Sequence, residues 1–184
     1  RPSLHPPSRA QPTPETNSKL DRNWGQRQNQ ISEGREATTM NAGRLDEIWN
    51  QQAIPVILRR DGWHEKLRVR LPKAGDNRKW INSLGKSYAV WMHGGSYWEL
   101  PKSWFNNFVN QALVRYKSLY AIQPYREQEK CAPACMNATG HECECSCMGV
   151  NHGAGNDGSW FEVSDTFATR WHERELACRL MIAK

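Results

Sequence analysis

The sequence lacks any long run of hydrophobic residues. No apolar stretch approaches the roughly 18–20 residues that a helix needs to cross a bilayer, which excludes a transmembrane helix and argues against a membrane partner. The first residues, RPSLHPPSRAQPTPE, have no apolar core and do not resemble a signal peptide. These absences favour an intracellular, cytoplasmic protein.

Apolar residues are also scarce overall, at 38% of the chain, and the shortage is greatest near its beginning. Residues 1–42 are rich in Pro, Ser and Gln and cannot bury enough surface to offset the entropy lost on ordering. We therefore predict a disordered tail over 1–42, which offers a contact segment for a protein partner.

Several catalytic motifs are missing. No GxxxxGK[ST] phosphate loop occurs, so the chain alone has no ATP-driven motor. The cytidine-deaminase pattern H-x-E…P-C-x-x-C is absent, because Ala134 follows Pro133. His141 begins HEC but lacks the second histidine of HExxH. A binding protein is therefore favoured over an enzyme.

Charge is unevenly distributed along the chain. Residues 53–127 carry 13 basic and 5 acidic side chains, whereas residues 128–184 carry 5 and 8. A local excess of this size suits a polyanion such as nucleic acid, although ordinary solubility would also explain it.

The residues from 43 to 127 predict an α+β module. Period-two alternation predicts strands at 54–60, 67–72, 87–92, 97–100 and 118–125, with turns at Asp61-Gly62 and Gly94-Gly95. Helical spacing predicts helices over 76–85 and 102–116, and a short docking helix over 44–52. The predicted fold is a small antiparallel sheet with two helices on one face.

Residues 128–184 predict a second, Cys/His-rich metal-binding module. After the cysteine segment, short strands are expected at 160–164, 166–171 and 175–182, with a helix as the alternative for the last of these. A metal would hold together a unit whose apolar core is small.

Basic and aromatic side chains are interleaved through the first module. Arg68 and Arg70 share one face of a strand, and other cations lie near the ends of predicted elements. Arginines that hold phosphates beside aromatic rings that stack on bases are typical of single-strand binding. The candidate nucleic-acid-binding residues are Arg59, Arg60, Arg68, Arg70, Lys73, Arg78, Lys79, Trp91, Tyr97, Trp98 and Lys102.

The segment LRVRLPKAGDNRKWINSLGKSYAVWMHGGSYWELPKSWFNNFVNQALVRYKSLYAIQP, within residues 67–124, resembles the HARP domain of annealing helicases. The matching features are the basic strand Arg68 to Leu71, the helix Trp80 to Gly85, Tyr88, Trp98 to Leu100, and the helix from Lys102. The resemblance covers about 60 residues and implies recognition of DNA forks or strand junctions.

Six soft ligands lie within the segment CAPACMNATGHECECSCMGVNHG. The candidate metal ligands are Cys131, Cys135, Cys143, Cys145, Cys147 and His152. Tetrahedral zinc needs four of them, so one or two are spare or two metals are present. A disulfide knot and an iron–sulfur cluster are the other interpretations, although ferredoxin spacings are absent.

The sequence thus favours a DNA-binding protein with a structural zinc site. Two alternatives remain: a metal-dependent nuclease that uses His152, and a protein-interaction adaptor with a structural zinc finger. Glu142 and Glu144 beside the cysteines would raise a thiol pKa, which argues against a reactive cysteine nucleophile.

Overall fold

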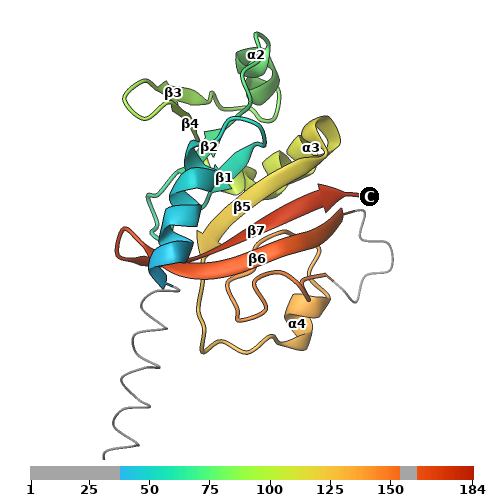
Figure 1. Ribbon diagram of the computed structural model, residues 1–184. Helices are drawn as coiled ribbons and strands as arrows, with labels where there is room; N and C mark the ends of the chain where they lie inside the picture. The colour runs from blue at the N-terminus through green and yellow to red at the C-terminus, as the bar shows by residue number, and fades with distance from the viewer. Residues whose placement is uncertain (1–37, 154–160) are drawn as a thin grey trace, which may run out of the picture. The chain divides into compact units, whose positions relative to one another are not determined.

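One mixed β-sheet links almost all the strands that the sequence predicts. The computed structural model describes residues 38–153 and 161–184, and within these ranges Met40–Lys184 form one compact unit. In the described part the sheet has seven strands in the order β3-β4-β2-β1-β5-β7-β6 (Figure 1). Their bounds are β1 Val56–Leu58, β2 Leu67–Arg70, β3 Val90–Met92, β4 Tyr97–Leu100, β5 Ser118–Pro124, β6 Phe161–Trp171 and β7 Arg174–Ala183.

The predicted α+β class is confirmed, although the sheet is larger than predicted and is not wholly antiparallel. β1 pairs antiparallel with β2, with Val56 opposite Arg70, and parallel with β5, with Val56 opposite Tyr120. The parallel pair arises because the chain passes through a helix before it returns to the sheet beside β1.

Two helices cover one face of the sheet, as predicted. They are α2 (Asn77–Asn82) and α3 (Phe105–Tyr116), and a short 3₁₀ helix, η1 (Lys102–Trp104), leads into α3. The apolar stripe of α3 is buried against Leu67 and Val69 of β2 in the larger of two cores, which also contains Trp98 and Met181.

A helix over residues 38–50 packs on the opposite face. Leu45, Ile48 and Trp49 are buried there, which confirms the predicted inward side of this helix. Their partners include Phe167 and Leu176 of the β6–β7 hairpin, which form the second core. The helix takes in residues 38–42, which were expected to belong to the tail; residues 1–37 lie outside the described residues.

The C-terminal strands differ from the prediction in length. The two short strands predicted between residues 160 and 171 are one strand, β6, with a register shift between Val163 and Asp165. The polar residues there suggested a turn, but a bulge accommodates them without breaking the strand. β7 pairs with β5 from Ser118↔Ile182 to Pro124↔Leu176, so the boundary predicted at 127/128 does not separate two sheets.

The cysteine segment forms the connection between β5 and β6. It contains one short helix, α4 (Pro133–Met136), and otherwise consists of turns (Figure 1). No helix among the described residues is long and apolar enough to span a bilayer.

Candidate metal centre

Tight turns bring the cysteines of the connection together. Cys135 lies in α4, whose first turn is closed by the Cys135 N–H donating to the Ala132 carbonyl at 2.9 Å. Around the last cysteine, the Met148 N–H donates to the Cys145 carbonyl and the Val150 N–H to the Cys147 carbonyl. The chain reverses at Met148 (φ 48°) and Gly149 (φ 91°), which allows it to return towards α4.

Four sulfurs lie at the corners of a compact tetrahedron. They belong to Cys135, Cys143, Cys145 and Cys147, and all six Sγ–Sγ distances fall between 3.4 and 3.9 Å. A disulfide requires about 2.05 Å, and all six cysteines, each within the described residues, are free. The geometry therefore does not fit the disulfide interpretation.

His152 and Cys131 flank this tetrahedron. The Nδ1 of His152 lies 3.2 Å from Cys135 Sγ, and its Nε2 lies 3.0 Å from the Gly140 carbonyl oxygen. A carbonyl can only accept, so Nε2 carries the proton and the Nδ1 lone pair faces the sulfurs. Metal-binding histidines are commonly oriented by such a second hydrogen bond.

The six predicted metal ligands thus meet at one place. Two overlapping groups have ligand atoms within 4.8 Å of one another: Cys131, Cys135, Cys145 and Cys147 form one, and Cys135, Cys143 and His152 the other. These clustered side chains could hold a metal ion.

The local environment shifts the pKa values of two cysteine thiols in opposite directions. Burial raises the pKa of Cys143 to about 12. Burial also acts to raise the pKa of Cys147, but backbone N–H donors at Asn151 and Gly149 and neighbouring thiols outweigh it and lower that pKa to about 7. The lowered pKa favours the thiolate of Cys147, the form that binds metals.

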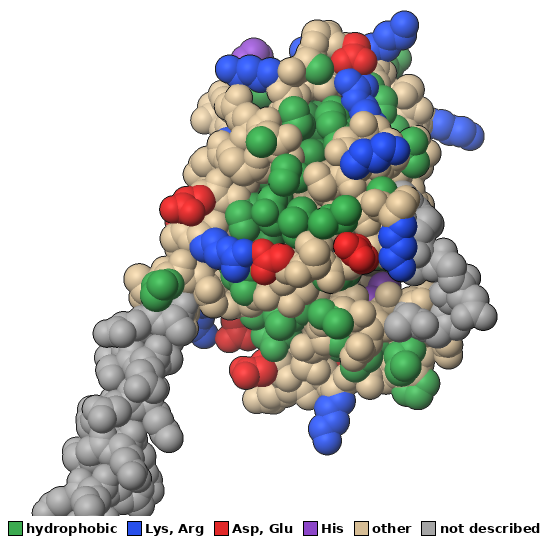
Figure 2. All heavy atoms as spheres, turned by 45° about the vertical axis from the view of Figure 1, so that its right-hand side comes forward, with side chains coloured by type: hydrophobic (Ala, Val, Ile, Leu, Met, Phe, Trp, Pro, Cys, Tyr) green, Lys and Arg blue, Asp and Glu red, His purple; other side chains and the backbone are tan. Residues whose placement is uncertain are grey.

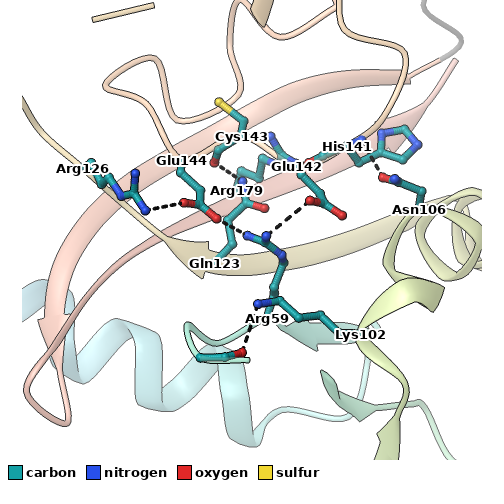
Figure 3. A network of polar contacts seen from close by, with 11 residues as sticks. Arg59, Lys102, Asn106, Gln123, Arg126, His141, Glu142, Cys143, Glu144 and Arg179 are labelled. Atoms are coloured by element: carbon teal, nitrogen blue, oxygen red, sulfur yellow. Dashed lines mark hydrogen bonds and ion pairs between the residues drawn. The ribbon is translucent and has the colours of Figure 1, made fainter. Parts of the chain in front are cut away.

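Buried polar side chains of the sheet hold the segment in place from below (Figure 3). Gln123 of β5 donates to the Cys143 carbonyl, and Arg179 of β7 donates to the His141 carbonyl. Both side chains are almost fully buried, at 1% and 3% exposed. Arg179 also passes so close to Gly149 that a Cβ there would lie 2.0 Å from its Nη1.

Helix α3 holds the same segment from the side. The His141 N–H donates to Asn106 Oδ1 at 2.7 Å, and His141 Nε2 lies 2.7 Å from Asn110 Oδ1. His141 is 4% exposed, and burial, with smaller effects of the Arg179 and His152 charges, lowers its pKa to about 4. It is therefore a neutral structural group at neutral pH.

Arg59 does not occupy the surface that a nucleic-acid contact requires. It follows β1, is 9% exposed, and points at the cysteine segment, where it donates to Glu144 and lies 3.3 Å from Glu142 (Figure 3). Arg126 lies 3.3 Å from the same Glu144. Arg59 therefore links the segment to the sheet, and its charge is already paired within the protein.

The other predicted nucleic-acid residues separate onto two faces of the sheet. Lys73, Arg78, Trp91 and Trp98 line one cavity of about 580 Å³ on the side of α2, although Trp98 is mostly buried. Arg68 and Arg70 lie on the opposite face, beside the rings of Tyr97 and Trp49 respectively. Arg60 lies on that face too, Lys79 is exposed on α2, and Lys102 donates to the Gly62 carbonyl.

Sequence reasoning missed the polar side chains that hold the segment: Asn106, Asn110, Gln123, His141 and Arg179. One signal was available. Gln123 and Arg179 interrupt otherwise apolar strands, and a polar residue at a buried strand position requires a hydrogen-bond partner.

Comparison with known proteins does not add to this picture: no family model, no curated protein and no solved structure matches the chain.

Proposed function

We propose that the protein binds nucleic acid, with DNA as the ligand, and that its Cys/His cluster holds a structural zinc ion. The carrying observation is the cavity between α2 and the β3–β4 hairpin, here called the basic groove and defined by Lys73, Arg78, Trp91, His93 and Trp98. Among the described residues, none of those that line it is acidic. Lys and Arg side chains project around this end of the unit in Figure 2.

The basic groove combines the two elements of single-strand binding. Lys73 and Arg78 are exposed and able to reach phosphates, while Trp91 keeps part of its ring accessible for a base. The Arg78 guanidinium lies 5.3 Å from the Trp98 ring centroid and packs on it, which orders a long side chain before a ligand arrives. The resemblance of residues 67–124 to HARP supports forked or branched DNA as the form bound.

The sulfur geometry supports zinc as the metal. The centre of a regular tetrahedron lies about 0.61 edge lengths from each corner, so edges of 3.4–3.9 Å place it about 2.1–2.4 Å from each sulfur, which brackets the Zn–S distance of about 2.3 Å. A [4Fe–4S] cluster instead holds each thiolate on a different iron, which separates the sulfurs further. We assign Cys135, Cys143, Cys145 and Cys147 as the ligands, with His152 and Cys131 beside them.

A structural role is favoured over catalysis. Four thiolates complete the coordination of zinc, whereas a catalytic site keeps one position open. The nearby carboxylates of Glu142 and Glu144 lie against Arg59. The Nε2 of His152 donates to the Gly140 carbonyl, and its Nδ1 faces the sulfurs at 3.2 Å from Cys135 Sγ, so the ring is oriented towards the cluster.

Buried Arg179 provides an electrostatic argument for a structural zinc site. A zinc ion with four thiolates carries a net charge of −2, and a buried anion requires a compensating cation. Burial lowers the pKa of Arg179, and the nearby thiol groups of Cys143, Cys147 and Cys135 act in the opposite direction, which favours its charged form. The chain therefore supplies a counter-charge beneath the cluster.

One sample tests both parts of the proposal. Protein purified without added metal is analysed for zinc, and its affinity for single-stranded and forked DNA is measured across a salt series. We expect about one zinc per chain and a steep loss of affinity with salt. Replacing Lys73 and Arg78 together by Gln should reduce the magnitude of the salt slope by about 1.4 on single strands, since each phosphate contact contributes about 0.7.

Matched variants distinguish the alternatives. Lys130→Gln removes an exposed cation just before the cysteine segment and should leave the slope unchanged. Trp91→Ala should weaken binding about tenfold or more by removing a stacking surface. Binding that is absent or insensitive to salt favours an adaptor, and Mg²⁺-dependent cleavage lost on His152→Ala would establish the nuclease.

A further inference from the structure

A second cavity lies on the sheet face opposite the basic groove. Its walls come from the 38–50 helix, from β2, from the residues that follow β1, and from the β6–β7 turn. The cavity has a volume of about 600 Å³, within the size range of small-ligand sites. We call it the arginine pocket, defined by Trp49, Arg60, Arg68, Trp171, His172 and Arg174. Trp49 and Leu176 place it over the second core, whereas Trp98 of the groove belongs to the first.

Three guanidinium groups line the arginine pocket, and the carboxylates near them are Asp46 in its wall and Glu65 and Glu99 beside it. Glu65 is shared, since it pairs with Arg60 and lies 3.5 Å from Arg174. Glu99 lies 3.8 Å from Arg68 and also 3.8 Å from Lys66. Glu65 and Glu99 are therefore each shared between two cations.

The hydrogen-bonding capacity of these arginines is also incompletely used. The Nε atoms of Arg60 and Arg68 are buried and have no hydrogen-bond partner among the described residues. Burial lowers the pKa of Arg60, and the positive charges of Arg68 and Arg174 lower it further. An anion between these groups would relieve their repulsion.

Aromatic rings form the rest of the wall. Trp49 and Trp171 meet edge to face with centroids 6.4 Å apart. The Trp171 Nε1–H donates to Asp46 at 2.8 Å, so the acidic group that lines the pocket is engaged in orienting this ring. The His172 ring lies 4.4 Å from the Trp171 ring between centroids, tilted by 58°, and it is exposed at the mouth of the pocket, whereas Trp171 is mostly buried.

We propose that the arginine pocket binds a nucleoside phosphate. The phosphate lies among Arg60, Arg68 and Arg174, and the base lies against Trp171 and His172. Guanidinium groups bind phosphate oxygens through paired hydrogen bonds, and aromatic side chains stack on bases irrespective of their sequence. A free nucleotide and the 5′-phosphorylated end of a DNA strand share this chemistry. The site is separate from the basic groove and does not depend on the function proposed there.

Calorimetric titration of the zinc-loaded full chain with AMP, adenosine and inorganic phosphate tests the assignment. We expect AMP to bind at about millimolar concentration or below, with adenosine and phosphate each weaker by about tenfold. Arg68→Gln combined with Arg174→Gln should weaken AMP by about tenfold or more, because each removes a charged hydrogen-bond donor. Both side chains are partly exposed, so this variant is expected to fold, which its circular dichroism and unfolding midpoint will verify.

The control is Arg78→Gln in the basic groove, which should leave AMP binding unchanged. In the Arg78→Gln background, tighter binding of a 5′-phosphorylated oligonucleotide than of its 5′-hydroxyl form identifies a strand end as the natural ligand. Binding of AMP without any preference for the 5′-phosphorylated oligonucleotide identifies a free nucleotide. Absence of binding to AMP and to the 5′-phosphorylated strand, or binding unaffected by the paired arginine variant, would overturn the proposal. Phosphate binding as tightly as AMP would overturn the role of the base.

Discussion

Arg59 provides the sharpest comparison between a residue's expected and observed roles. Replacing it with Met keeps much of the side-chain volume and removes the charge that faces Glu142 and Glu144. Loss of one partner from a buried ion pair costs about 3–5 kcal/mol. Here the Arg59 side chain is 11% exposed, but Glu144 and Glu142 are 22% and 45% exposed and regain water. Arg126 also remains beside Glu144. We therefore expect a loss of about 2–3 kcal/mol in the free energy of unfolding.

Urea unfolding at a fixed concentration of free zinc measures this loss, and competition with a chromophoric chelator measures zinc retention. Arg59→Met should lower both. The double-mutant cycle with Glu144→Gln should give a coupling energy of about 1–2 kcal/mol, because the two side chains interact directly. Lys102→Met, whose ammonium makes only a 3.3 Å contact with the Gly62 carbonyl, should change stability by about 0.5 kcal/mol or less.

Measurement of DNA affinity distinguishes an internal role of Arg59 from a surface role. Because Arg59 is paired inside the protein, the folded Arg59→Met variant should bind DNA within about twofold of the unmodified chain. A variant that retained full stability and zinc while losing salt-dependent DNA binding would refute the internal role and restore the surface role.

Three further predictions concern the cysteine segment and its surroundings. Gly149→Ala should destabilise the protein and weaken zinc retention, because φ at this position is +91° and the new Cβ would meet Arg179. The control is Gly43→Ala, on a helix where a new Cβ would meet no atom within 4 Å. It should stabilise the protein by about 0.5–1 kcal/mol in thermal unfolding. Because the pKa of buried His141 is lowered to about 4, the unfolded chain takes up a proton below about pH 6.5 that the folded chain does not, and stability should fall by up to about 3 kcal/mol between pH 6.5 and 4. His141→Gln should flatten that part of the urea-measured pH profile, and an unchanged profile would contradict the burial of a neutral imidazole. Removing zinc with a chelator should increase amide exchange in residues 131–153 far more than in β1, β2 and β4; equal increases would show that the metal stabilises the whole sheet.

Local patterns were sufficient to predict many individual elements. Alternation in LRVRLP predicted β2 with Leu67 and Val69 inward, and the spacing of Phe105, Phe108 and Leu113 predicted the buried side of α3. These patterns work because each element shows its own burial in its own residues. The spacing of the cysteines likewise predicted a common site, because turns between nearby residues leave few ways to separate them.

Pairings between distant segments could not be predicted in the same way. Nothing within β1 indicates that it receives β5 in parallel on one side, because strand order depends on the path of the intervening chain. The same limitation applies to Arg59. Its partners lie more than 80 residues later, and an arginine at the end of a strand has the same appearance in sequence whether it meets a phosphate or Glu144.

The order β1-β5-β7-β6 has a consequence for synthesis on the ribosome. When β5 has emerged, its partner on one side, β1, is already made, but its other edge stays open until β7 is complete, since Ser118 pairs with Ile182. During that interval the nascent chain exposes a strand edge of the kind that promotes aggregation. The cysteine segment is synthesised in this same interval. Early capture of the proposed metal would place a folded connection over Gln123 before the hairpin arrives, so we expect metal availability to govern the yield of folded protein as well as its stability.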